Sequence, residues 1–215
     1  MKRIIVIIFA LMFVFSFYLN AQENKCSGWY VESKTVVPWE KEHKRSVEEI
    51  TIFARSVPDC DFGFFSNTRI KMWKNYGEEK RTIWFESVVG FSILPVDYFS
   101  MNIGVGTENE LWRVFASSWL GNDYISLSGF ISGGGSEMWC KTQLMITPLP
   151  WVSGGAYYEY KIGVGPKLEI KIPKTPVSFS GSLLFNTYKE RDENGYTTNK
   201  IIGERNYMFT VRITF

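Results

Sequence analysis

The feature that most limits what this chain can fold into is the alternation of apolar and polar residues from residue 82 to the end. A period of two is typical of β-strands whose two faces meet different surroundings. Most connections between the runs are short, as antiparallel hairpins require. Eight runs follow this pattern, at residues 83–93, 99–105, 112–120, 125–133, 138–148, 156–172, 177–188 and 207–215. The sequence therefore predicts an all-β fold with an antiparallel, up-and-down sheet.

The residues on the polar faces favour a membrane barrel over a soluble β-sandwich or lipocalin-like barrel. Alternation alone does not say which face meets water. Only the run 156–172 has a polar face rich in long charged residues, whereas the others carry mainly Ser, Gly, Asn and Thr. Small polar residues suit the interior of a narrow barrel. We expect a transmembrane β-barrel of 8 to 10 strands.

The first 21 residues have the pattern of a secretory signal peptide. Lys2 and Arg3 precede an apolar stretch from Ile4 to Leu19, and Ala21 is a small residue at the expected cleavage point. Removal of this segment leaves 22 basic and 22 acidic residues. A neutral mature chain does not point to nucleic acid as a partner.

Residues 22–81 form a separate N-terminal segment before the barrel at 82–215, and two structures fit them. Ser46 to Glu49 matches a helix capping box, with Ile50 and Phe53 at helical spacing. The stretch 49–53 also alternates and has a plausible partner strand at 68–72, and we favour this hairpin. The hairpin gives ten strands, and a helix beside the barrel gives eight.

The last strand resembles the C-terminal assembly signal of bacterial outer-membrane β-barrel proteins. It ends on phenylalanine, with apolar residues at every second position before it: Tyr207, Phe209, Val211, Ile213 and Phe215. The runs 98–106 and 161–165 are similar to strands of small barrels in that family. The resemblance implies export to the bacterial outer membrane, contact with outer-membrane lipid, and insertion by the outer-membrane assembly machinery, which reads this strand.

In a barrel, the charged residues of the alternating runs point inward. The predicted interior charges are Glu86, Arg113, Lys141, Glu159, Lys161 and Arg212, together with Lys167, Glu169 and Lys171. Opposite charges in a narrow lumen should pair and close it, so a wide pore is not expected. If eight strands close the barrel, Arg212 should pair with Glu86. If ten do, Glu49 becomes the candidate partner of Arg212.

Cysteine and histidine usage gives little sign of chemistry. Cys26 and Cys60 lie in the N-terminal segment of an exported chain and could form a disulfide, while Cys140 is on an apolar strand face. With one histidine and no paired cysteines, no zinc site is readable, and no cofactor is expected. The barrel enzymes of this family use a histidine, but His43 lies in a charged loop candidate, so we expect no enzymatic activity.

The expected function is that of a non-enzymatic outer-membrane barrel with a structural, adhesion or narrow-transport role. The polar stretch 189–206 is the longest connection, and it should face the exterior and contact an extracellular partner. The alternative is a secreted soluble β-barrel or β-sandwich module that binds an apolar ligand, in which case Phe209, Val211 and Ile213 face a core.

Overall fold

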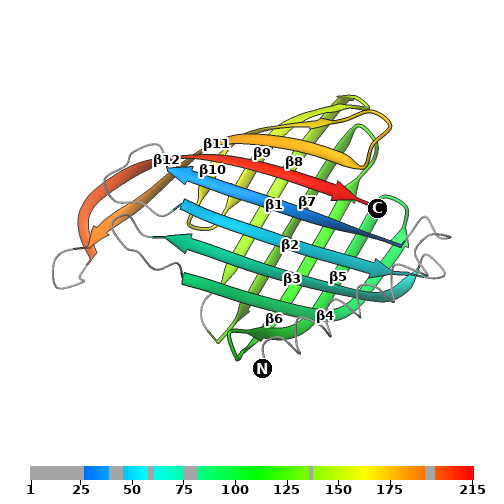
Figure 1. Cartoon of the computed structure of the whole chain (residues 1–215), viewed down its shortest axis with the longest axis horizontal. Coiled ribbons are helices and arrows are strands. Elements are labelled where there is room, and N and C mark those ends of the chain that lie inside the picture. The colour runs from blue at the N-terminus through cyan, green and yellow to red at the C-terminus, as the bar shows by residue number, and fades with distance from the viewer. Residues whose placement is uncertain (1–26, 39–45, 58–60, 75–81, 136–137, 192–196) are drawn as a thin grey trace.

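The chain forms a single closed antiparallel barrel of twelve strands (Figure 1). The computed structural model describes residues 27–38, 46–57, 61–74, 82–135, 138–191 and 197–215. Each strand pairs with its sequence neighbours, and β12 closes the ring on β1. The strands are β1 (Gly28–Pro38), β2 (Ser46–Ser56), β3 (Phe62–Lys74), β4 (Thr82–Val96), β5 (Phe99–Glu108), β6 (Leu111–Gly121), β7 (Ile125–Gly134), β8 (Trp139–Leu149), β9 (Val152–Glu159), β10 (Gly163–Lys171), β11 (Val177–Arg191) and β12 (Thr197–Thr214).

The prediction of 8 to 10 strands is wrong, and one of the two missing strands was hidden inside the run 156–172. This run is a hairpin, with β9 and β10 joined by a tight turn in which Lys161 has a φ of 62°. Tyr158 and Val164 pair across the hairpin and both point outward. Even-numbered residues point outward both before and after the turn. The alternation of apolar and polar residues therefore continues through the turn, and the sequence pattern does not reveal where one strand ends and the next begins.

The other missing strand is β1, which shows little contrast in hydropathy between its faces. Its inward face carries Glu32 and Lys34, and its outward face includes Ser33 and Thr35. The favoured hairpin before residue 82 is present as β2 and β3, with Glu49 opposite Lys71 and Ile50 opposite Ile70. The described part of residues 22–81 therefore belongs to the barrel wall.

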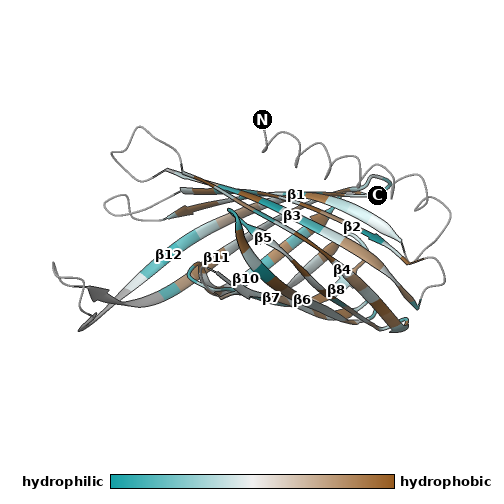
Figure 2. Ribbon diagram, turned by 90° about the horizontal axis from the view of Figure 1, so that it is seen from below, coloured by the Kyte–Doolittle hydropathy of each residue, from teal (hydrophilic) through white to brown (hydrophobic). Residues whose placement is uncertain are grey.

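The outward face of the barrel is a band of exposed apolar side chains. Phe64, Phe91, Val105, Leu168 and Phe209 are each about half exposed or more. Apolar and polar residues alternate along the strands in Figure 2. A large exposed apolar surface of this kind is the face that a membrane barrel presents to lipid. Within the described ranges, no helix combines the length and apolarity needed to cross a membrane.

The two ends of the barrel differ. The start of β1 and the end of β12 lie at one end, here called the terminal end, where β4 and β5 are joined by only Asp97 and Tyr98. The eight alternating runs of the sequence place the connection 147–155 on the same side as 189–206, but it is mostly strand and its turn lies at the terminal end. Three strands, and not two, lie between the two connections, because the run 156–172 is a hairpin. An odd number of antiparallel strands places the two connections at opposite ends of the barrel.

At the opposite end, β11 and β12 continue well beyond their neighbours. The last pairs with β10 and β1 involve Phe185 and Asn206, but β11 and β12 remain paired up to Arg191 opposite Thr197. We call residues 187–191 and 197–205 the hairpin extension, which projects from the barrel in Figure 1. Most of the stretch 189–206 is therefore strand and not loop.

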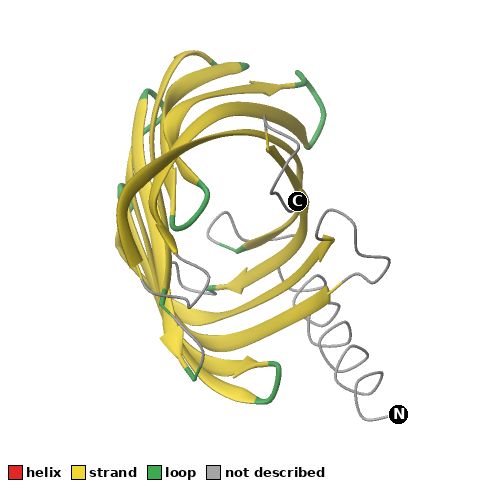
Figure 3. Ribbon diagram, turned by 90° about the vertical axis from the view of Figure 1, so that its left-hand side faces the viewer, coloured by secondary structure: helices red, strands yellow, loops and turns green. Residues whose placement is uncertain are grey.

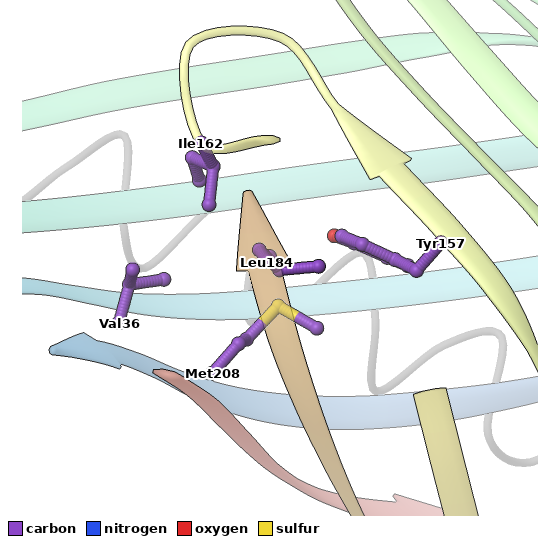
Figure 4. Packing of buried hydrophobic residues seen from close by; sticks show 5 residues of the cluster. All are labelled: Val36, Tyr157, Ile162, Leu184 and Met208. Atoms are coloured by element: carbon purple, nitrogen blue, oxygen red, sulfur yellow. The ribbon is translucent and has the colours of Figure 1, made fainter. Parts of the chain in front are cut away.

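Two apolar clusters fill parts of the lumen. The first consists of Val36, Tyr157, Ile162, Leu184 and Met208, which converge from β1, β9, the β9–β10 turn, β11 and β12 (Figure 4). The second consists of Phe65, Val88 and Phe115. Gly104 makes room for the second cluster, because a Cβ atom there would lie 2.9 Å from the Phe65 ring.

Candidate functional site: the lumen

The lumen is lined by charged side chains that are almost completely buried. Lys34, Glu49, Arg69, Glu86 and Glu159 are each at most 2% exposed. All five come from inward positions of strands, because the period of two sends every second side chain into the barrel. Buried charges are stable only when they are paired and hydrogen-bonded. The pairs group into three clusters.

Glu86 on β4 is the centre of the first cluster. Its Oε1 accepts a hydrogen bond from Arg69 Nε at 2.9 Å, and its Oε2 accepts bonds from Arg113 Nε and from the Ser132 hydroxyl, both at 3.1 Å. Arg113 Nε also lies 2.9 Å from a carboxylate oxygen of Glu108. Two arginines therefore balance two glutamates in this cluster.

Lys34 on β1 is the centre of the second cluster. Its Nζ donates to both carboxylate oxygens of Glu159 at 2.8 and 2.9 Å, and it lies 3.2 Å from Glu49 Oε2. Lys71 Nζ lies 3.2 Å from the same Glu49 oxygen, and the Tyr157 hydroxyl donates to Glu159. Two lysines balance two glutamates here as well.

The third cluster lies at the seam between β1 and β12. Glu32 and Arg212 are directly opposite each other, and Arg212 Nε donates to Glu32 Oε2 at 2.9 Å. Lys141 Nζ on β8 lies 3.8 Å from Glu32 Oε1. The Arg212 guanidinium also lies 4.8 Å from the centre of the Tyr30 ring. This cluster has one more cation than anions.

The structure places five of the six interior charges of the sequence analysis in the lumen: Glu86, Arg113, Lys141, Glu159 and Arg212. Lys161 is instead exposed in the β9–β10 turn, because the strand that was to carry it is a hairpin. The expected Glu86–Arg212 pair is wrong, since Glu86 pairs with Arg69 and Arg113. Arg212 closes on Glu32, and not on Glu49 as a ten-strand barrel requires, because β1 is the strand next to β12.

Sequence reasoning missed the basic and acidic partners on β1 and β3, including Glu32, Lys34, Arg69 and Lys71. A pattern in which charged residues occupy every second position, whatever uncharged residue lies between them, could have revealed these partners. In Thr68–Arg69–Ile70–Lys71–Met72 the charges occupy every second position, as they do in Glu32–Ser33–Lys34.

Toward the terminal end, the lumen widens into a cavity of about 820 Å³ with both polar and apolar walls, which we call the vestibule. Its walls carry many hydroxyl and amide groups, among them Ser100, Asn102 and Gln143. Five cationic side chains and two anionic ones line it: Arg55, Arg69, Lys141, Lys171 and Arg212 against Asp97 and Glu169. Arg69 is balanced within the first cluster and Glu32 offsets one cation of the third, so three cations remain against two anions in the vestibule.

Four residues of the C-terminal resemblance, Tyr207, Phe209, Val211 and Ile213, occupy the outward face of β12, and Phe215 follows its end. Phe209 and Val211 are 59% and 39% exposed, which does not fit a soluble module with these residues in a core. Phe215 stacks on Trp29 with ring centres 4.1 Å apart, and their backbones exchange two hydrogen bonds. The proposed signal peptide 1–21, Cys26, Cys60 and His43 lie outside the described residues. Cys140 is a free thiol.

Comparison with known proteins relates the chain to outer-membrane barrels through its structure. No protein-family model matches the sequence, and no curated protein matches it. Solved structures of KdgM porin, and of KdgM porin in complex with disordered oligogalacturonate, each match with a TM-score of 0.58 and 13% identity, covering 86% of this chain and 99% of the porin. Outer membrane phospholipase A from Escherichia coli matches with a TM-score of 0.40 and 8% identity, covering 87% of this chain and 92% of that chain. The KdgM porin matches show that the chain has the fold of a bacterial outer-membrane β-barrel.

Proposed function

We propose that this protein is a non-enzymatic barrel of the bacterial outer membrane that serves as a narrow conduit for small solutes, and that the conformation described here is closed. The observation that carries the proposal is the division of the lumen into a vestibule of about 820 Å³ and a closed region of buried ion pairs. A purely structural barrel needs no hollow end. A wide pore would not have a lumen crossed by buried charges.

The membrane location is supported by the outward apolar band. Lipid is the medium in which half-exposed residues such as Phe64, Phe91 and Phe209 are stable. The apolar residues Tyr207, Phe209, Val211, Ile213 and Phe215 resemble the C-terminal signal that the outer-membrane assembly machinery reads. We propose this machinery as the partner in insertion.

The charge of the vestibule supports a preference for anions. Fixed charges of one sign in a cavity with low-dielectric walls raise the local concentration of the opposite ion. Once the cations paired with Glu86 and Glu32 are set aside, three cations remain against two anions in this cavity, a small positive excess. A carboxylate- or phosphate-bearing solute should enter more readily than a cation of the same size.

Cell fractionation and conductance measurements test this function. We expect recovery in the outer-membrane fraction, a compact gel band that shifts on boiling, and small, anion-selective currents in planar lipid bilayers. Recovery as a soluble periplasmic or secreted protein overturns the membrane assignment. If the folded barrel conducts no current, even in variants whose lumen has been opened by mutation, the proposed conduit function is wrong.

Adhesion is a second candidate function, favoured by the hairpin extension. This segment has paired backbone up to Arg191 and Thr197, and among the described residues no other strand pairs with it. Unpaired strand edges are where another chain can add a strand. If the extension binds an extracellular partner, cells whose barrel carries a short turn in its place should no longer adhere to a surface that binds the wild-type cells. The boiling-sensitive gel band should persist, because the barrel itself remains folded.

A further inference from the structure

Three polar or cation–π contacts link β1 and β3 to β8 and β9, which lie far away around the ring. Lys34 and Glu159 join β1 to β9, which are four strands apart along the shorter way round. Glu32 and Lys141 join β1 to β8, which are five strands apart. Lys71 Nζ on β3 lies 3.6 Å from the centre of the Trp139 ring on β8, also five strands away. We call these the cross-lumen contacts.

A circular barrel would not allow these contacts. Twelve strands spaced about 4.8 Å apart and tilted about 40° close into a circle roughly 24 Å across, measured between backbones. Strands four or five steps apart on that circle are separated by roughly 20 Å or more, farther than an extended lysine and glutamate span together. The barrel section must therefore be flattened where these residues meet, and Figure 3 shows an oval ring of strands.

The three contacts draw the same two walls together. One wall is β1 and its neighbours up to β3, and the other is β8 and β9. Lys34 is 2% and Glu159 1% exposed, so their pair is shielded from water and salt. The wall itself resists flattening less than it resists stretching, because its backbone hydrogen bonds are kept at either shape.

We propose that the cross-lumen contacts hold the barrel in a flattened, closed section, and that their release lets it become rounder and opens the passage beyond the vestibule. The opening of a passage rests on the conduit function proposed above, whereas the flattening does not. The decisive element is the Lys34–Glu159 pair, which has the shortest distances and the strongest charge assistance.

The test variant is K34A/E159A. It removes one cation and one anion, and it leaves Glu49 paired with Lys71. The matched control is K167A/E169A, which also removes one cation and one anion from inward positions, both on β10. Lys167 bonds to Gln143 on β8, only two strands away along the wall, so the control breaks no cross-lumen contact. K141A is a milder second variant, because Glu32 keeps its bond to Arg212.

Two readouts separate the flattened section from the conduit. Spin labels at Ser33 on β1 and Thr142 on β8, both outward and exposed, report the distance between the walls in a C26A/C60A/C140A background. We expect K34A/E159A to lengthen this distance by about one strand spacing, roughly 5 Å. The control should leave it unchanged, and K141A should give a smaller increase. In parallel, single-channel conductance of K34A/E159A should rise several-fold over that of the wild type.

Each outcome has one meaning, provided that the boiling-sensitive gel band shows a folded barrel. An unchanged wall distance in both K34A/E159A and K141A overturns the proposal. A longer distance without any current supports the flattened section and overturns the conduit function. Equal conductance in K34A/E159A and K167A/E169A shows that the pair does not control the passage and also overturns the proposal.

Discussion

At the scale of single residues, Glu86 shows how the lumen tolerates buried charge. Its carboxylate is fully buried and is bonded by two guanidinium groups and one hydroxyl. Every acceptor site that faces the lumen is used. The residue is therefore a fixed structural anion, and its removal leaves Arg69 and Arg113 without their shared partner.

Substitution of Glu86 by Gln should strongly destabilise the barrel. Removing one partner of a buried charge cluster costs about 3–5 kcal/mol, because the remaining charges stay desolvated. Urea unfolding in lipid vesicles measures the change. The control is E169Q, since Glu169 is only half-buried and lines the vestibule. Equal unfolding midpoints for the two variants would contradict this account of Glu86.

At the scale of secondary-structure elements, the β9–β10 hairpin depends on its backbone as well as its side chains. Gly163 follows the turn with a φ of 129°, and a Cβ atom there would lie 2.6 Å from the carbonyl oxygen of Phe185. Only glycine adopts this conformation without strain and fits this space.

Gly163→Ala should therefore destabilise the barrel by about 1–3 kcal/mol, through backbone strain and displacement of β11. Gly181→Ala is the matched control, because an added Cβ atom there meets nothing within 4 Å. Thermal unfolding, followed by the loss of the compact gel band, compares the two. If G181A is as damaging as G163A, the conformation of Gly163 is not the cause.

The sequence predicted the all-β class, the antiparallel connections and most inward positions, because each depends on a local period of two. Strand number and pairing depend on turns and on the strand that closes the ring. The turn at Lys161 keeps the alternation intact, and β1 has too little contrast between its faces to be recognised. Because β1 was not recognised, the sequence also predicted the wrong partner for Arg212. The partner lies on the strand next to β12, and that strand is β1.

At the scale of the whole molecule, the outward band distinguishes a membrane barrel from a soluble one. Phe209 is 59% exposed and lies on the outward face of β12. In water, a lysine at an exposed position usually changes stability by less than about 0.5 kcal/mol. In a bilayer, a lysine near the midplane costs about 2–4 kcal/mol.

Phe209→Lys should therefore cost about 2–4 kcal/mol in lipid vesicles, as measured by reversible denaturant unfolding. Asp123→Lys, in the exposed turn between β6 and β7, is the control and should have little effect. Were F209K to unfold like D123K, the outward face would not contact lipid at this position.

The orientation of the barrel is also open to measurement. If the terminal end faces the periplasm, the hairpin extension lies outside the cell. Protease added to intact cells should then cut within residues 187–205 and leave the rest of the barrel protected. The short turn at Pro150 and Trp151 serves as the internal control, since it lies at the other end. Cleavage there, with the hairpin extension spared, would reverse the orientation.

The pairing of β1 with β12 has a consequence for the order of folding. The hydrogen bond from Arg212 to Glu32 joins residues 180 positions apart, whereas every other strand pairs with its immediate neighbour in sequence. Contacts of such high sequence separation form late, because the loop between them must first be ordered. Eleven hairpin pairings can thus form one after another into a curved sheet with two free edges. The ring exists only once these edges meet, so defects at the seam should slow assembly while leaving each hairpin able to form.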